Sequence, residues 1–230
     1  METILITGAN RGLGLEFVRQ YAQAGCRVFA CCRDPQTADG LQAVAAASEA
    51  VRVCALDVSE ADQITALAKE LDGESIDILL NNAGLMGPRG MGPGNVDKAE
   101  WIHVFVVNTV APLQMVGAFL PHLLRGERKL IATMTSKMGS IEDNSSGGSY
   151  VYRSTKSAVN QVNKSLSIDL AGMGVTSVVL HPGWVSTDMG GSNATLGPEE
   201  SVRGLRGVLD GLTPAQSGAF VDYGGAEIPW

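Results

Sequence analysis

A tyrosine and a lysine at helical spacing are the side chains in this sequence best placed to do chemistry together. The stretch SYVYRSTKSAV, residues 149–159, is typical of the start of a helix, in which each residue turns by about 100°. Tyr152 and Lys156 therefore lie on one face about a turn apart, whereas Tyr150 points away from the lysine. An ammonium near a phenol favours the phenolate and makes the phenol a better proton donor near neutral pH. The same spacing also arises when a lysine stem merely packs on a ring, so the surrounding chain must decide.

Short apolar segments alternate with helical segments along the whole chain. We expect strands at ETILITG, RVFACCR, VRVCALD, IDILLNNAG, KLIATMTS, VTSVVLHPG and GAFVDY. Helices are predicted over residues 12–24, 36–49, 59–71, 97–125, 150–172 and 198–211, the third with Ser59 as its N-cap. Strands that are apolar throughout indicate a parallel sheet covered on both faces. We therefore predict one α/β domain over residues 1–230, a single doubly wound parallel sheet of about seven strands, the Rossmann fold.

The first predicted strand runs directly into the glycine-rich segment TGANRGLG, residues 7–14. Gly8, Gly12 and Gly14 lie where the chain must turn sharply, let a pyrophosphate approach the backbone and pack a helix closely on the sheet. The helix that begins here offers free N–H groups and the positive end of its dipole to a phosphate. Glycine clusters also form ordinary turns, but in the first strand–helix turn of such a sheet this one favours a dinucleotide.

The end of the second predicted strand indicates which dinucleotide is preferred. NAD-preferring proteins place an Asp or Glu there, whereas this chain has Cys32 followed by Arg33. Arg11 in the glycine turn can approach the same place, and two guanidiniums suit a 2′-phosphate. Asp34 follows directly and weakens this inference, unless it caps the next turn. We expect NADP(H) to be preferred, with NAD(H) possible.

Composition and charge narrow the class of partner. The 230 residues carry a net charge of −7 and a pI near 4.9, which argues against nucleic acid or an anionic membrane surface as the main partner. We expect no secretory signal and no segment long enough to span a bilayer, and hence a cytoplasmic protein. The four cysteines form no C-x-x-C pair and the three histidines no zinc motif, so we predict buried reduced thiols and no metal.

Seven motifs in register resemble the single-domain short-chain dehydrogenase/reductases over nearly the whole chain. They are TGANRGLG, LDV at Asp57, NNAG at 81–84, VNTVAP around Asn108, TSKMG at 135–139, YRSTK at 152–156 and HPGWVSTDM at 181–189. The tail GAFVDYGGAEIPW, with YVYRSTKSAVN and GWVSTDMGG, is most similar to the subgroup that holds C-factor and sniffer-type carbonyl reductases.

The resemblance implies a role for each matching residue. Tyr152 would be the general acid and base, and Lys156 would bind the nicotinamide ribose. Ser136 would donate to the substrate oxygen, where charge develops in the transition state. Asn108 would kink the long helix and hold a water that links the lysine to solvent. The cofactor contacts implied by the resemblance are Gly8, Asn10, Arg11, Gly12, Leu13, Gly14, Arg33, Asp57, Val58, Asn82, Ala83, Gly84, Tyr152, Lys156, Pro182, Gly183, Val185 and Thr187.

Two departures from the family pattern concern the substrate side. Ser136 lies further before Tyr152 than the serine of many relatives does, with EDNSSGG in between, so Ser140 is the alternative. After Asp188 only MGGSNATLG precedes Pro198, where many relatives insert a longer lid. We therefore expect an open pocket, with four candidate wall residues: Met86, Met138, Trp184 and Met189.

The resemblance predicts an NADPH-dependent reductase of ketone or aldehyde carbonyls that also oxidises alcohols. Its partner would be a small-molecule carbonyl or alcohol, and relatives suggest a homo-oligomer, either a dimer or a tetramer. A signalling protein of C-factor type that binds the dinucleotide with little turnover is the alternative. A sugar epimerase is less favoured, because those relatives carry a further substrate domain.

Overall fold

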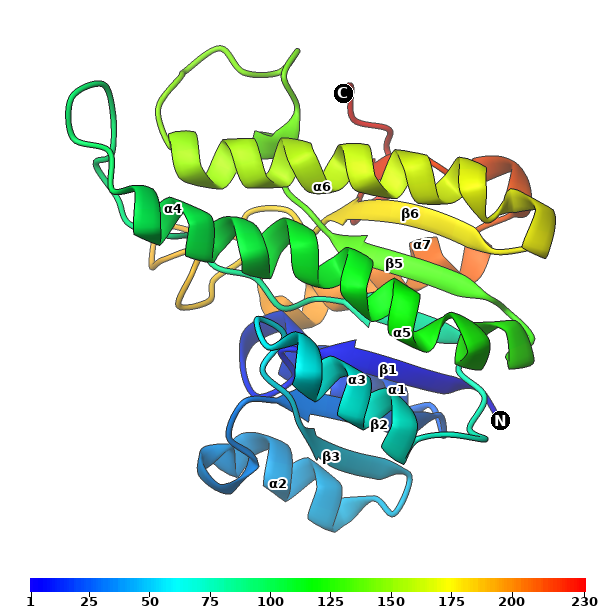
Figure 1. Ribbon diagram of the computed structural model, residues 1–230. Helices are drawn as coiled ribbons and strands as arrows, with labels where there is room; N and C mark the ends of the chain where they lie inside the picture. Colours follow the sequence, from blue (N-terminus) through cyan, green and yellow to red (C-terminus); the bar gives the residue numbers. More distant parts are fainter.

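The computed structural model describes all residues 1–230 and has a seven-stranded parallel sheet at its centre (Figure 1). Across the sheet the strand order is β3-β2-β1-β4-β5-β6-β7, with every neighbouring pair parallel. This arrangement confirms the predicted doubly wound α/β fold. The strands are β1 (Thr3–Thr7), β2 (Arg27–Cys32), β3 (Val51–Ala55), β4 (Ile78–Asn81), β5 (Leu130–Met134), β6 (Thr176–His181) and β7 (Phe220–Asp222).

Helices cover both faces of this sheet. One layer consists of α1 (Gly12–Gln23), α2 (Asp39–Ala47) and α7 (Pro198–Gly211). The other consists of α3 (Ala61–Glu70), α4 (Lys98–Phe105), α5 (Ala111–Arg125) and α6 (Tyr150–Asp169). Successive residues of the central strand β1 point to opposite layers: Ile4 and Ile6 join the first core and Leu5 joins the second. Burial on both faces explains why the inner strands, such as β1 and β4, are mostly apolar, whereas the edge strand β3 is partly exposed and includes Arg52.

The start of α3 differs from the sequence prediction. The helix begins at Ala61 and its N-cap position is Glu60, with no side-chain cap, so the prediction of Ser59 as N-cap was wrong. The Ser59 hydroxyl instead donates to Asp57 Oδ1 at 2.7 Å. A serine near a helix start has several local acceptors, and here the carboxylate two residues earlier binds it first.

Two predicted helices include a short 3₁₀ turn. The second predicted helix opens with Pro35–Thr37, which Asp34 caps by accepting a hydrogen bond from Gln36 N at 3.0 Å. Asp34 is therefore the cap of the next turn, one of the two alternatives that its position allowed. Arg33 is then the charged side chain at the end of β2. At its far end α6 stops at Asp169 and a 3₁₀ turn follows.

The helices α4 and α5 form one continuous helix, Lys98–Arg125, with a π-helical turn at Val106–Val110. By length and composition alone this helix could cross a membrane, so our expectation that no segment is long enough was wrong. Half of its most apolar window is buried, because one face packs against the sheet and α3. A core helix of a globular protein passes the same length and hydropathy test.

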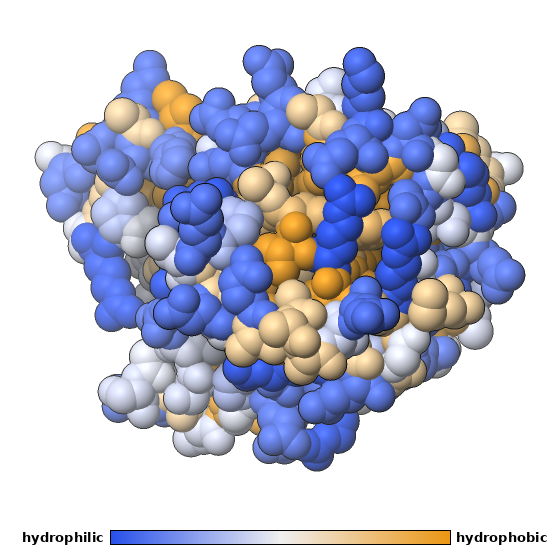
Figure 2. All heavy atoms as spheres, turned by 90° about the horizontal axis from the view of Figure 1, so that it is seen from below, coloured by the Kyte–Doolittle hydropathy of each residue, from blue (hydrophilic) through white to orange (hydrophobic).

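The edge strand β3 lies on the lower side of the molecule in Figure 1, the side that Figure 2 views. Hydrophobic surface shows in the middle of this face between hydrophilic side chains (Figure 2). Arg52 of β3 forms an ion pair with Glu70 of α3. Charged side chains of this kind oppose pairing of an exposed edge strand with another chain.

Candidate active site

A cleft of about 720 Å³ lies at the carboxyl ends of the parallel strands, between the glycine turn after β1 and the helix α6. Its volume is in the range of cofactor and small-molecule sites. The lining contains all but four of the predicted site residues. Those outside the lining are Asn108, Ser136, Gly183 and Val185.

The glycine turn is held in shape by close packing and by one amide side chain. Gly8 has a φ of 66°, and a Cβ there would lie 2.9 Å from Ala83 Cα. A Cβ on Gly14 would lie 2.1 Å from the Gly8 carbonyl oxygen, so only glycine fits. Asn82 Nδ2 donates to the carbonyls of Thr7 at 2.9 Å and Gly8 at 3.1 Å. The first turn of α1 has no side-chain cap, so its N–H groups are free to bind an anion.

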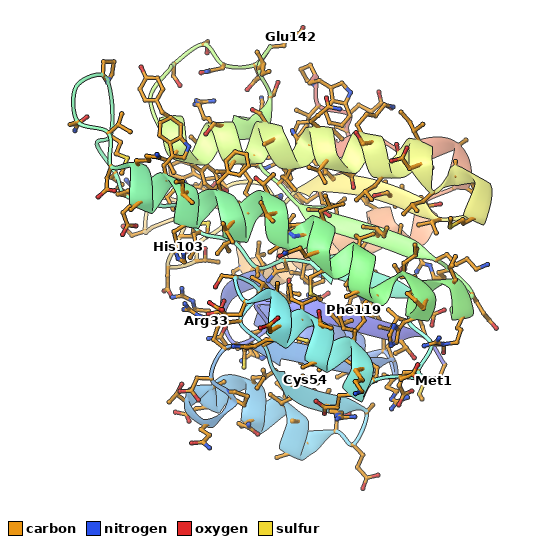
Figure 3. All side chains as sticks on the ribbon, in the orientation of Figure 1. Met1, Arg33, Cys54, His103, Phe119 and Glu142 are labelled. Atoms are coloured by element: carbon orange, nitrogen blue, oxygen red, sulfur yellow. The ribbon has the colours of Figure 1, made fainter.

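Charged side chains gather where β2 and β3 end. Burial raises the pKa of Asp57, but hydrogen bonds from Ser59 and the positive charges of Arg33 and His103 outweigh it and leave the pKa below its ordinary value. Arg33 and His103 are seen at this same edge of the molecule in Figure 3. Sequence reasoning missed His103 as a lining residue. The signal was its position on the helix, four residues before Val107, which also lines the cleft.

Tyr152 and Lys156 lie together in the cleft. Their exposed fractions are only 8% and 4%, and the ammonium lies 5.7 Å from the centroid of the phenol ring. Lys156 Nζ donates to the carbonyl of Met134, the last residue of β5, at 2.9 Å. Tyr150 is 47% exposed and does not line the cleft, as the helical spacing predicted.

Burial shifts the pKa of both groups. Loss of hydration raises the pKa of Tyr152 to about 12, opposed only by a hydrogen bond with Ser136. Loss of hydration also lowers the pKa of Lys156 to about 8. In the chain alone, desolvation of the phenolate dominates the pKa of Tyr152. That the Lys156 ammonium, together with an oxidised nicotinamide, stabilises the phenolate stays a prediction. At neutral pH the phenol keeps its proton, which is the form that can donate one.

The serine next to the tyrosine is Ser136. Its hydroxyl is buried, interacts with Tyr152, and accepts a hydrogen bond from Met138 N at 3.1 Å, which caps a short 3₁₀ turn. Ser140 faces elsewhere: its hydroxyl accepts from Asp143 N at 3.0 Å and donates to the Trp230 carbonyl at 3.4 Å. The structure favours Ser136 over Ser140 as the hydroxyl of this site.

The longer loop between Ser136 and Tyr152 is fastened by Arg153. Its guanidinium donates to the Met138 carbonyl at 3.3 Å and to the Ser146 hydroxyl at 2.9 Å. These bonds tie both ends of the loop to the residue that follows the tyrosine. Residues 141–149 of the loop are exposed, so the longer loop extends into solvent and not over Ser136, which stays buried.

Asn108 lies in the π-helical turn and positions other elements of the site. Its Oδ1 accepts from Leu85 N at 2.8 Å, and its Nδ2 donates to the Leu85 carbonyl at 2.8 Å and to Thr155 Oγ1 at 3.0 Å. The amide thus joins the chain after β4 to α6 at the residue before Lys156. The irregular turn occurs where the resemblance implied a kink, and the bridging water stays a prediction.

The loop after β6 contributes less to the lining than predicted. Gly183 has a φ of 82°, and a Cβ there would lie 2.7 Å from Leu196 Cδ2, so this residue packs inside the loop. Val185 is buried and forms a β-bridge with Leu196. Pro182 and Thr187 do line the cleft. Gly183 and Val185 therefore determine the shape of the loop, and Pro182 and Thr187 of the same loop line the cleft.

Of the four predicted wall residues, only Met189 lines the cleft. Trp184 is 58% exposed, and its indole N–H donates to the Gly190 carbonyl at 2.9 Å. Met86 and Met138 lie outside the lining. Further lining residues that were not among the predicted site residues are Leu56, Leu85, Met134, Thr135, Ser186, Asp188 and Pro198.

Arg11 lines the cleft, and its guanidinium forms an ion pair: Arg11 Nη1 lies 2.8 Å from Asp188 Oδ2, on the opposite lip of the cleft. That Arg11 can also approach the place beside Arg33 stays a prediction. The two residues are 177 positions apart in sequence, so no local pattern could have predicted the pair.

Other candidate chemistry lies away from the cleft. Cys26, Cys31 and Cys54 are buried free thiols outside the lining, while Cys32 is a buried thiol at its edge. The chain brings together no group of three His, Cys, Asp or Glu side chains suited to a metal. His181 ends β6 outside the lining, and burial lowers its pKa to about 4.

A family model described as short chain dehydrogenase matches residues 2–195. The chain belongs to the short-chain dehydrogenase/reductase family. Among curated family members, the C-signal of Myxococcus xanthus is 47% identical over 155 residues, which cover 67% of this chain and 93% of that protein. The 1-hydroxy-2-glutathionyl-2-methyl-3-butene dehydrogenase of Rhodococcus is 34% identical over 236 residues, the full length of both chains.

Solved structures of short-chain dehydrogenases/reductases superpose on the whole chain. The carbonyl reductase Sniffer of D. melanogaster gives a TM-score of 0.93 at 34% identity, covering 100% of both chains. The NADPH-bound carbonyl reductase from chicken fatty liver also gives 0.93 at 34% identity, covering 100% of this chain and 99% of that one. The family and the fold implied by the sequence motifs are therefore confirmed.

Proposed function

We propose that this short-chain dehydrogenase/reductase is an NADPH-dependent carbonyl reductase that converts ketones or aldehydes to alcohols and also runs in reverse. The observation that carries the proposal is the buried pair Tyr152 and Lys156, with Ser136 buried behind the lining, in the same cleft as the glycine turn and Arg33. Similarity to two carbonyl reductases over the whole chain supports it, one of them solved with NADPH.

The residues of the cleft fit a nicotinamide dinucleotide phosphate. The uncapped first turn of α1 suits the pyrophosphate, and the guanidinium of Arg33, with no carboxylate in the last position of β2, suits a 2′-phosphate. Asp57 Oδ1 is bound by Ser59, which leaves Oδ2 to accept from the adenine amino group. Lys156 makes one hydrogen bond within the protein, so two N–H groups of the ammonium remain for the ribose hydroxyls.

The bound nicotinamide would supply the hydride, and the protein would supply the proton. With a pKa near 12, Tyr152 is protonated at neutral pH and can give its proton to the carbonyl oxygen. The Lys156 ammonium lies close enough to stabilise the phenolate that remains. Ser136 would donate to the same carbonyl oxygen, where negative charge develops.

A dinucleotide-binding signalling protein is the second candidate, and the 47% identity to C-signal favours it. A protein that only binds the dinucleotide does not need a buried proton donor such as Tyr152. Tyr152 and Lys156 both lose hydration in the fold, an arrangement that a binder would have no reason to retain. Turnover with a carbonyl compound would therefore decide between the two candidates.

The test is NADPH oxidation, followed by the absorbance of the reduced nicotinamide, with aldehydes and ketones of graded size as substrates, repeated with NADH. We expect turnover with several compounds, bulky ketones among them, and a lower KM for NADPH than for NADH. A protein that binds NADPH tightly but reduces no member of the panel would support the signalling candidate. Reduction of only the smallest compounds would contradict the open pocket that the short segment after Asp188 suggests.

We also propose self-association through the outer face of α4 and α5. Ile102, Val110 and Leu113 are exposed on this one long helix. Such apolar surface is typical of an interface between copies. Sedimentation of the protein at several concentrations tests this proposal, and a monomer at all concentrations would contradict it.

A further inference from the structure

An ion pair crosses the mouth of the cofactor cleft. Arg11 belongs to the glycine turn and Asp188 to the loop after β6, and their side chains meet at 2.8 Å. Both residues line the cleft, and their side chains are 66% and 78% exposed. Beside them, Thr187 Cγ2 would lie 3.5 Å from a Cβ on Gly12. The two lips of the cleft therefore approach each other at this point.

The Arg11 guanidinium has a second possible position, beside Arg33. Ala9 N donates to the Cys31 carbonyl at 2.9 Å, which fastens the glycine turn to the end of β2. Arg11 and Arg33 each lie two residues beyond this bond, and both line the same cleft. A long side chain in this position can turn toward Asp188 or toward the 2′-phosphate site beside Arg33.

We propose that Asp188 limits the preference for NADPH over NADH by competing with the adenosine 2′-phosphate for Arg11. The inference rests on the proposed use of NADPH. Asp188 is a specificity-determining residue that acts through Arg11, without a contact of its own to the phosphate. With NADH there is no 2′-phosphate to draw Arg11 away, and the ion pair stays closed.

The expected effect is modest, because the pair is exposed. Exposed ion pairs contribute little, so releasing Arg11 from Asp188 should change affinity by about two- to fivefold. A phosphate monoester carries about −1.5 to −2 charges against −1 for a carboxylate, so the phosphate wins the competition once it is present. Both interactions are screened, and the effect should shrink as salt is raised.

The test compares dissociation constants for NADPH and NADH, measured by fluorescence titration at low ionic strength with the full chain. We expect Asp188→Asn to bind NADPH about two- to fivefold more tightly, with a smaller change for NADH. Arg11→Gln should weaken NADPH binding selectively. In the Arg11→Gln background, Asp188→Asn should no longer alter the ratio of the two constants. The dissociation constants of 2′,5′-ADP, which carries the 2′-phosphate, should change as those of NADPH do. Those of 5′-ADP, which lacks it, should change as those of NADH do.

Glu199→Gln is the matched control. Glu199 pairs with Arg203 at 2.6 Å with exposed fractions of 75% and 66%, close to those of the Asp188 pair, but neither residue lines the cleft. This variant should leave the ratio of the two dissociation constants unchanged. If Asp188→Asn acted only by removing one negative charge near the cleft, Glu199→Gln would change cofactor binding in the same way.

Three results would overturn the inference: an equal change for both cofactors in Asp188→Asn, a weaker NADPH complex in that variant, or a ratio that still shifts when Arg11 is absent. Failure of the proposed function looks different. A wild-type protein that binds NADPH but reduces no carbonyl refutes the reductase and leaves the comparison of Asp188 variants intact.

Discussion

Replacement of Lys156 by methionine should stabilise the fold at neutral pH while it abolishes turnover. The pKa of Lys156 falls from an ordinary 10.5 to about 8 because the side chain is buried. A difference of about 2.5, at roughly 1.4 kcal/mol for each pKa unit, means that keeping the ammonium charged in the fold costs about 3–3.5 kcal/mol. Methionine has a similar length and no charge, and it loses only the hydrogen bond to the Met134 carbonyl, worth about 1 kcal/mol. The net gain is about 2 kcal/mol.

The stability advantage of Lys156→Met should depend on pH. Below pH 8 Lys156 is protonated in both the folded and the unfolded chain, so the full cost is present. Between pH 8 and 10.5 the unfolded chain binds one proton more than the folded chain, and wild-type stability gains on that of the variant as pH rises. The advantage of Lys156→Met should therefore be largest at pH 7 and shrink by about 2 kcal/mol by pH 9.5.

Urea unfolding of wild type and Lys156→Met at pH 7.0 and 9.5 measures both quantities. A gain of about 2 kcal/mol corresponds to a melting temperature about 4–8 °C higher for a chain of this size. Lys164→Met, at an exposed position on the same helix, is the control and should change stability by less than about 0.5 kcal/mol. A Lys156→Met protein that is less stable than wild type at pH 7, or a difference that does not change with pH, would refute the reasoning.

Three further predictions concern the neighbours of this pair. Ser136→Ala should lower kcat for carbonyl reduction about a hundredfold or more, whereas Ser140→Ala, whose hydroxyl faces the C-terminal segment, should change it by only a few fold; equal losses in steady-state assays would contradict the assignment. Asn108→Ala leaves both backbone groups of Leu85 without their partner and should lower the free energy of unfolding by about 2–3 kcal/mol, measured by urea unfolding. The rate of reduction, followed as kcat/KM against pH, should fall as pH rises above about 8, because Lys156 then loses the proton that stabilises the phenolate.

The features that the sequence predicted well are those set by local periodicity. Apolar strands alternating with helices were enough for the doubly wound sheet, because parallel strands need crossover helices. The pairing of Tyr152 with Lys156, and the exclusion of Tyr150, required only the helical repeat. Asp34 as the cap of the next turn was likewise a local choice.

The features that the sequence could not predict depend on distance and burial. The ion-pair partner of Arg11 comes from a loop 177 residues away. Burial raises the pKa of Tyr152, and the loss of hydration at a buried site is a property of the whole fold. Ser59 failed as an N-cap because α3 begins only at Ala61, with Glu60 at the N-cap position. A long-range contact decided the first of these outcomes, burial the second and the start of α3 the third.

The most direct test of the account is a single-turnover measurement of hydride transfer with NADPH bound in advance. Tyr152→Phe removes only the phenol oxygen, and Tyr150→Phe makes the same change at the exposed tyrosine two residues earlier. We predict that Tyr152→Phe binds NADPH normally but transfers hydride at least about a hundredfold more slowly, while Tyr150→Phe matches wild type. Rapid hydride transfer in Tyr152→Phe would contradict the central claim that this buried phenol donates the proton.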